Sequence, residues 1–210
     1  GKGLRIGVIR HFFEKDLVAS EEMRDAIGAA LTVLEKAGAE LVDIDTRALR
    51  EFGDCNRIIL LSEAYAVHEK DLRERPQDYG ELTRQRLLPG AFFRAVDYVQ
   101  ALRQRTIIHA EVSAILDKQC DVLITASSME AAFPIEDAQA SATLYPRQAR
   151  APFNLTGHPA LSVPTGFNDE GLPLAMQIVG RAFDEATVYR VAGAYENETR
   201  WHERHPPLTD

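Results

Sequence analysis

The spacing of apolar residues predicts an alternation of strands and helices along the chain. The apolar run at 4–9 is short and rich in β-branched residues, which predicts a buried strand. Ser20 can cap a following helix, and Gly38 stands where that helix should end. The apolar residues between them recur on one helical face, namely Met23, Ile27, Ala30, Leu31 and Leu34. Residues 39–44 predict a second strand, so this region forms a βαβ unit with parallel strands and a right-handed crossover.

The middle of the chain has a helical pattern. We expect one helix over 54–75, ended by a proline, a shorter one after Tyr79-Gly80, and a long one over 93–118. Residues 70–105 contain more arginine than acidic residues, but the acidic residues are interleaved with the arginines. This pattern predicts solvated helix faces rather than a nucleic-acid-binding patch.

The last part of the chain returns to strands. A buried strand is predicted at 121–125, and residues 126–148 lack periodicity and are expected to be mostly loop. Two apolar runs, 160–164 and 174–179, are separated by a turn and are each introduced by a Gly-x-Pro tripeptide. A final helix should begin at Asp184, and the tail after it should be peripheral. The class is α/β, a single domain over 1–210 with a mixed, largely parallel sheet covered by helices.

Composition narrows the function. The 210 residues are 45% hydrophobic and 27% charged, with a net charge of −8, which argues against nucleic acid as the main partner. No apolar run approaches the ~20 residues that cross a bilayer, so we expect no membrane association. Two cysteines, Cys55 and Cys120, make neither a disulfide framework nor a metal pattern, which favours the reducing cytoplasm.

Most catalytic motifs are missing from the sequence. It contains neither a glycine-rich phosphate loop nor a Gly-x-Ser-x-Gly elbow, so we expect no nucleotide or other cofactor. His202, Glu203 and His205 are close together, but the pattern suggests no third His or Cys ligand, so we expect no metal site. His158 lies between a glycine and a proline and is interpreted as a turn residue rather than a base.

The serines and amides are candidates to line a pocket. Ser127 and Ser128 follow the strand at 121–125, and ligands bind at the carboxyl ends of strands in open α/β sheets. A nucleophilic serine needs a base in reach, and none is specified nearby, so pocket lining is the preferred interpretation. Ser162 is interpreted as structural. Asn154 and Gln177 could orient a polar substrate or satisfy loop backbone, and the sequence leaves both alternatives open.

Two long blocks resemble a known family. "APFNLTGHPALSVPTGF" (151–167) and "EGLPLAMQIVGRAFDEATVYRVAGAYE" (170–196) resemble the C-terminal part of the amidase signature family. Three earlier stretches resemble blocks of the same region in the same order: "GLRIGVI", "SEAYAVHEKDLRERPQDYG" and "DVLIT". The resemblance covers nearly all of this chain, but only about the second half of a typical family member. It implies that the two Gly-x-Pro-introduced strands belong to the large mixed sheet that supports the active site.

The resemblance also implies that the catalytic residues lie upstream of this region and that this region supplies part of the pocket. Family members hydrolyse amides with a Ser, a cis-Ser and a Lys that lie in the first half, upstream of this region, next to a Gly/Ser-rich loop. This sequence has no such stretch, so we assign it no catalytic residue. The expected pocket residues lie in the loops at 126–132 and 148–155, which should be close together; they are Ser127, Ser128, Met129, Arg150 and Asn154.

Partners and alternatives follow from the same resemblance. The expected partners are a small-molecule amide, the N-terminal portion of the same protein and, where apolar surface is left uncovered, a second copy of the chain. Ala175 stands where family members usually have Gly, and Arg150 where many have Thr, so the pocket should differ in shape. One alternative is the A-type component of a glutamyl-tRNA amidotransferase, although residues 62–80 do not resemble that block of it. The other is a non-catalytic scaffold that reuses this half of the fold.

Overall fold

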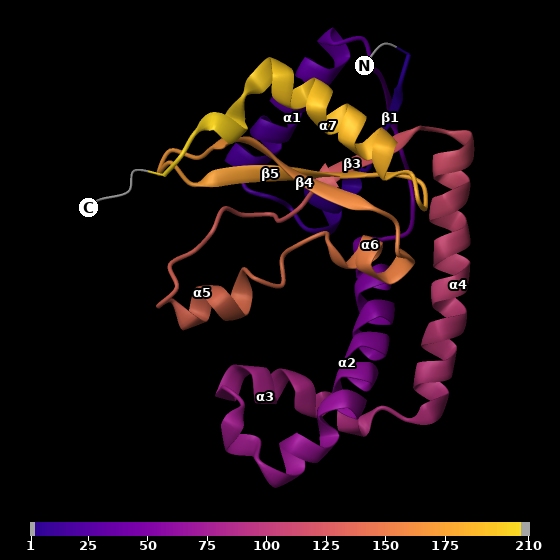
Figure 1. Ribbon diagram of the computed structural model, residues 1–210, viewed down its shortest axis with the longest axis vertical. Helices are drawn as coiled ribbons and strands as arrows, with labels where there is room; N and C mark the ends of the chain where they lie inside the picture. The colour runs from indigo at the N-terminus through magenta and orange to yellow at the C-terminus, as the bar shows by residue number, and fades with distance from the viewer. Residues whose placement is uncertain (1–2, 207–210) are drawn as a thin grey trace.

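A computed structural model describes residues 3–206 and arranges the strands of this part of the chain in one sheet of order β2-β1-β3-β5-β4 (Figure 1). The strands are β1 (Arg5–Val8), β2 (Glu40–Asp43), β3 (Val122–Ala126), β4 (Ala160–Phe167) and β5 (Pro173–Val179). β1 runs parallel to β2 and β3, whereas β5 is antiparallel to β3 and β4. The sheet is therefore mixed, and its parallel half is the β2 side. The short turn between β4 and β5 permits only antiparallel pairing.

The predicted βαβ unit is confirmed. Its helix, α1 (Glu21–Lys36), begins where the Oγ of Ser20 accepts a hydrogen bond from the backbone N–H of Met23, at 3.2 Å. The helix is followed by Gly38 at φ +96°, a conformation that favours glycine. The predicted apolar face is buried. β1 and β2 pair in parallel, with Ile6 opposite Leu41.

Replacing Ser20 by alanine should lower the free energy of unfolding by about 1 kcal/mol, because the N–H of Met23 loses its acceptor. Urea denaturation followed by circular dichroism measures this difference. Thr32→Ala is the matched control, since Thr32 is exposed on the same helix and its hydroxyl only bonds back to Gly28. Equal effects of the two substitutions would contradict the capping role.

The remaining helices lie in two groups. α1 contacts α7 (Glu185–Thr199), and both pack against β4 and β5. Figure 1 shows α1 and α7 on one side of the sheet, with α6 and the start of α2 on the other. The long helices α2 (Leu49–Glu74) and α4 (Ala95–Lys118) contact each other and extend beyond the sheet. α7 begins where predicted, because the Asp184 carboxylate accepts from the N–H of Thr187 at 3.3 Å.

α2 begins five residues before the predicted start, for a tertiary reason. The backbone N–H of Leu49 donates to the carboxylate of Asp16, 2.7 Å away, so the cap comes from a segment 33 residues upstream. Local sequence carries no such signal. The other elements are α3 (Glu81–Leu87), α5 (Ala138–Thr143), α6 (Ala151–Thr156), a π-helical turn (Phe12–Asp16) and 3₁₀ turns at Pro76–Asp78, Leu88–Phe92 and Trp201–Glu203.

The 3₁₀ turns, α5, α6 and the π-helical turn were not expected from the sequence. α5 interrupts the segment predicted as mostly loop, and α6 precedes β4 and ends at Gly157, whose φ is +76°. The π-helical turn buries Phe12 and Phe13. Part of the tail packs against the sheet, because Trp201 meets the ring of Phe167 edge-on at 5.9 Å between centroids. Residues 207–210, also predicted peripheral, lie outside the described part of the chain.

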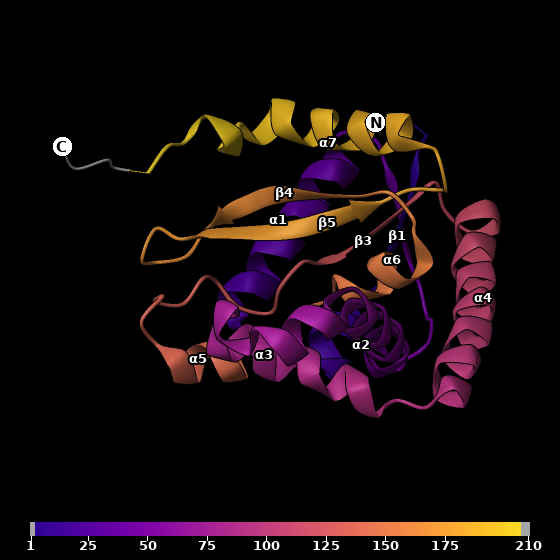
Figure 2. The ribbon, with the colours of Figure 1, turned by 60° about the horizontal axis from the view of Figure 1, so that its bottom comes forward.

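Burial agrees with the sequence pattern at the centre of the sheet. All five residues of β3 are buried, as expected for a continuous apolar run, and Figure 2 shows β3 beside β5 in the sheet. The same core contains the inner faces of α1 and α7. Within residues 3–206, no helix is both long enough and apolar enough to cross a membrane.

Candidate substrate pocket

The loop that leaves β3 is paired with the loop that leads into α6. The N–H of Ala149 donates to the carbonyl of Ser127 at 3.2 Å, and the N–H of Met129 donates to the carbonyl of Arg147 at 3.0 Å. Ser128 and Gln148 form an isolated antiparallel bridge. The segments 126–132 and 148–155, which the sequence places far apart along the chain, therefore lie side by side.

The side chain of Gln177 also joins the two segments. Its side chain is only 4% exposed, and its Nε2 donates to the carbonyl of Ala126 at 2.9 Å and to that of Ala149 at 2.7 Å. Both carbonyls belong to the paired segments, so one amide joins the end of β3 to the start of the second loop. Of the two roles considered for Gln177, the structure supports satisfaction of the loop backbone.

A cavity of about 280 Å³ opens beside these loops. Ser127, Ser128 and Arg150 line it, together with Tyr145 and residues of the β5 start. Met129 is fully buried and does not line this cavity, although its backbone carries the loop pairing. Asn154 lies on α6, exposed, and is also absent from the lining. The structure thus brings three of the five expected pocket residues to one cavity.

Ser127 lines this cavity, but its hydroxyl partner, Ser162, does not. The hydroxyls of Ser127 and Ser162 lie 3.1 Å apart, and either can be the donor. Within residues 3–206, neither hydroxyl hydrogen-bonds to a histidine, lysine or carboxylate that could remove its proton. The cavity can hold a polar group through the hydroxyls of Ser127 and Ser128, but the Ser127–Ser162 pair does not by itself supply a nucleophile.

A second, larger cavity was not anticipated from the sequence. It has a volume of about 1200 Å³ and is lined by α2, α3 and the segment from Ala142 to Ala151. Two of its apolar lining residues, Leu60 and Leu82, are 56% and 52% exposed. Tyr145 lines both cavities, so they lie next to each other. The sequence signal was weak, because apolar residues on a long helix are equally expected to face a core.

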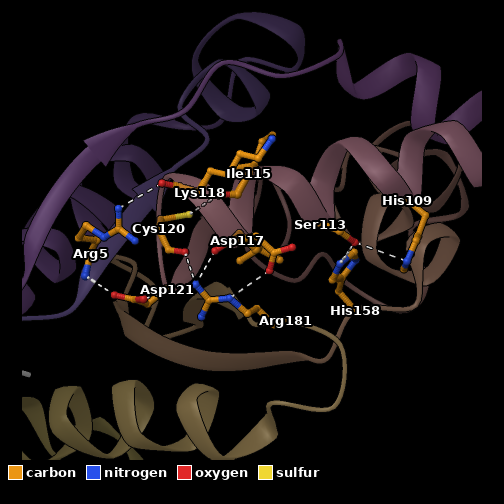
Figure 3. Close-up of polar contacts among 11 residues, drawn as sticks. Arg5, His109, Ser113, Ile115, Asp117, Lys118, Cys120, Asp121, His158 and Arg181 are labelled. Atoms are coloured by element: carbon orange, nitrogen blue, oxygen red, sulfur yellow. Dashed lines mark hydrogen bonds and ion pairs between the residues drawn. The ribbon is translucent and has the colours of Figure 1, made fainter.

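His158 belongs to a closed hydrogen-bond network between α4 and the end of α6 (Figure 3). The Nδ1 of His109 lies 2.8 Å from the carbonyl of Thr156, which can only accept, so this nitrogen carries the proton. In the neutral ring its Nε2 then accepts from the hydroxyl of Ser113, at 3.4 Å. Ser113 in turn accepts from the Nε2 of His158 at 3.2 Å, and the Nδ1 of His158 accepts from the Thr156 hydroxyl at 2.9 Å. His158 is thus a turn residue, as interpreted, but also a buried network member.

The network keeps His158 neutral. Its side chain is 5% exposed, and burial lowers its pKa to about 4, with the stacked ring of His109 adding to the effect and the carboxylate of Asp117 opposing it. The unfolded chain binds a proton on this residue near pH 6.5, whereas the folded chain binds one only near pH 4. The stability that the neutral ring contributes is therefore complete above about pH 6.5 and is lost as the pH falls toward 4.

We expect the free energy of unfolding to fall by about 3 kcal/mol between pH 7 and pH 4 through His158 alone. Urea titrations at several pH values measure this, and His158→Gln should flatten the slope between pH 6.5 and 4. His202→Gln, at an exposed residue of the tail, is the control and should keep the wild-type slope. If the slope of His158→Gln equals that of the wild type, His158 does not hold a depressed pKa.

A separate polar cluster in Figure 3 has a structural role. Arg181, in the turn after β5, donates to the carbonyl of Cys120 at 3.0 Å and pairs with Asp117 at 3.4 Å and Asp121 at 3.5 Å. It thereby neutralises the carboxyl end of α4. Burial raises the pKa of the Cys120 thiol to about 11, so this cysteine stays protonated and unreactive at neutral pH.

Comparisons with known proteins agree with this architecture. The family model described as Amidase matches residues 1–189. The chain is 36% identical over 215 residues to an amidase of Pseudomonas putida, covering 99% of this chain and 45% of the relative. It is 34% identical over 231 residues to the A-type component of the glutamyl-tRNA(Gln) amidotransferase of Synechococcus sp. strain JA-2-3B'a(2-13), covering 99% of this chain and 44% of the relative.

A solved structure extends the similarity to three dimensions. A crystal structure of an amidase matches with a TM-score of 0.80 and 25% identity, over 94% of this chain and 46% of that one. The chain thus spans about half the length of the curated relatives it matches.

Proposed function

The chain belongs to the amidase family, and from this premise we propose that it is the C-terminal part of a hydrolase that cleaves carboxamide C–N bonds. In this proposal the chain supplies the sheet and one wall of the substrate pocket, while the nucleophilic serine, its bridging serine and a lysine come from an N-terminal portion. Water adds to the carbonyl carbon overall, the C–N bond breaks, and the nitrogen leaves as an amine with a proton.

The observation that carries the proposal is a cavity that presents a few polar groups but contains no activated nucleophile. Ser127, Ser128 and Arg150 line the cavity at the carboxyl end of β3, where open α/β sheets bind ligands. Relatives named as amidases share this part of the chain and are about twice as long. The exposed Leu60 and Leu82 supply apolar surface that an N-terminal portion or a second copy can cover. The free, buried thiols of Cys55 and Cys120 support a cytoplasmic setting.

The proposal is tested by supplying the chain with an N-terminal portion from a relative. The chain is fused behind the part of the Pseudomonas putida amidase that precedes the matched region, and ammonia release from a panel of carboxamides is measured. We expect hydrolysis by the fusion and none by either part alone. A fusion that circular dichroism shows to be folded, and that carries a reactive serine yet hydrolyses no carboxamide, would contradict the proposed function.

The second candidate function is that of the A-type component of an amidotransferase, favoured by the identity to the Synechococcus protein. The lengths of the two alignments distinguish the two candidate functions. The alignment with the P. putida amidase covers 215 positions, close to the 210 residues of the chain, whereas that with the amidotransferase component covers 231 and needs more gaps. This difference supports the general amidase. Glutamine hydrolysis that appears only when partner proteins co-purify would support the amidotransferase instead.

A further inference from the structure

Two arginines from distant parts of the chain meet at one aromatic ring. The guanidinium carbon of Arg86, on α3, lies 5.2 Å from the ring centroid of Tyr145, and that of Arg150, just before α6, lies 5.7 Å from the same centroid. The two contacts join α3 to the segment between α5 and α6, which Figure 1 shows facing each other below the sheet. Cation–π contacts hold both charges near the ring without neutralising them.

Neither charge has an acidic partner. Within residues 3–206, other surface arginines form ion pairs, such as Arg75 with Asp71 and Arg94 with Asp97, both at 2.8 Å, but no ion pair includes Arg86 or Arg150. Both arginines are exposed, so their charges remain available to a bound anion.

The pair lies where a substrate would sit. Arg86 lines the larger cavity and Arg150 the smaller one, and Tyr145 lines both. Arg150 shares the smaller cavity with the hydroxyls of Ser127 and Ser128. An anion between the arginines would therefore place the other end of a short molecule near these serines.

The acidic side chains that line the two cavities are already engaged. Glu130 pairs with Arg147 at 3.0 Å, and Asp16 accepts the N–H of Leu49 at 2.7 Å. The amide oxygen of Gln148 accepts from the Nε of Arg150 at 3.1 Å and so orients this guanidinium while leaving its terminal nitrogens as donors. A planar fork of donors suits a carboxylate better than any neutral group.

We propose that Arg86 and Arg150 form an anionic subsite and that the substrates are amides that also carry a carboxylate, such as the monoamide of a short dicarboxylic acid. This inference rests on the proposed function for the amide end of the molecule. The carboxylate would lie between the two guanidinium groups, beside the ring of Tyr145, and the amide would reach toward Ser127 and Ser128. Since no neutral group compensates the two charges, neutral amides of equal length should bind far more weakly.

A ligand-binding experiment tests the subsite independently of any catalytic activity. The 210-residue chain is titrated with succinamate and, in parallel, with the neutral diamide succinamide, and the arginine Nε–H signals are followed by NMR. We expect saturable binding of succinamate, at least tenfold tighter than that of succinamide and weakened by added salt. Arg86→Gln and Arg150→Gln should each weaken it about tenfold.

The control variant removes the same charge elsewhere. Arg190 is exposed on α7 and lines neither cavity, so Arg190→Gln should leave succinamate binding unchanged. Arg150→Lys keeps the charge but not the fork and should fall between wild type and Arg150→Gln. Equal binding of the two ligands, no saturation with succinamate, or equal losses for Arg190→Gln and Arg150→Gln would overturn the subsite.

These outcomes are separate from those of the fusion experiment. Binding of succinamate that depends on both arginines, with no hydrolysis by the folded fusion, would keep the subsite and reject the hydrolase. Hydrolysis of succinamide and succinamate at equal kcat/KM would keep the hydrolase and reject the subsite.

Discussion

Replacing Gly7 by valine is expected to leave the chain largely unfolded at 25 °C. Gly7 lies in β1, between β2 and β3, and a Cβ added there would come within 2.7 Å of the Cys120 sulfur, 2.7 Å of Ile44 and 2.9 Å of Leu123. All three neighbours are buried in the same core, so none can move into solvent. Overpacking a core with one or two extra methylene groups lowers the free energy of unfolding by about 1–3 kcal/mol. Valine adds three carbons, so we expect the free energy of unfolding to fall by more than about 4 kcal/mol.

Gly28→Val is the matched control for this substitution. Gly28 is exposed on α1, and a Cβ there would meet nothing within 4 Å, so the free energy of unfolding should change by less than about 1 kcal/mol. Circular dichroism and urea denaturation measure both variants. A Gly7→Val chain as stable as Gly28→Val would mean that β1 does not pack as described.

Replacing Gln177 by leucine should cost about 4 kcal/mol and disorganise the pocket. The buried carbonyls of Ala126 and Ala149 would both lose their donor from this side chain, and each buried acceptor left unpaired costs about 1–3 kcal/mol. Since these carbonyls belong to the segments that carry Ser127 and Arg150, succinamate binding should weaken as well. Urea denaturation and the NMR titration measure the two effects.

Gln100→Leu is the control for the loss of an amide. Gln100 is exposed on α4, and its replacement should change stability by no more than about 0.5 kcal/mol. If Gln177→Leu retains both wild-type stability and wild-type ligand binding, the amide does not join the two loops.

The fold was predictable wherever local signals agreed. In α1, the cap at Ser20, the apolar face and Gly38 all indicate the same helix, and the structure confirms each of them. The strand β3 was evident from its continuous apolar run. The start of α2 could not be predicted, because its cap is Asp16, and α6 was missed because six residues are too few to show a helical period.

Part of the pocket was predictable because a local sequence signal, a buried strand, precedes it. Ser127 and Ser128 could be assigned from their place after a buried strand, and they line the smaller cavity with Arg150. Arg86 was interpreted as part of a solvated helix face. Arg73, which pairs with Glu69 at 2.8 Å, and Arg86 are both exposed, as expected, but Arg86 also lines the larger cavity. Its neighbour Tyr145 is 59 positions away in sequence, and no local pattern reveals such a contact.

The most direct test of the proposed division of labour is to locate the reactive serine. The 210-residue chain and its fusion to the N-terminal part of the P. putida amidase are each treated with a fluorophosphonate probe and examined by intact mass and peptide mapping. We expect no adduct on the chain alone and a single adduct on the fusion, on a serine of the N-terminal part. A stoichiometric adduct on Ser127, Ser128 or Ser162 of the chain alone would contradict this division, because the nucleophile would then lie within these 210 residues.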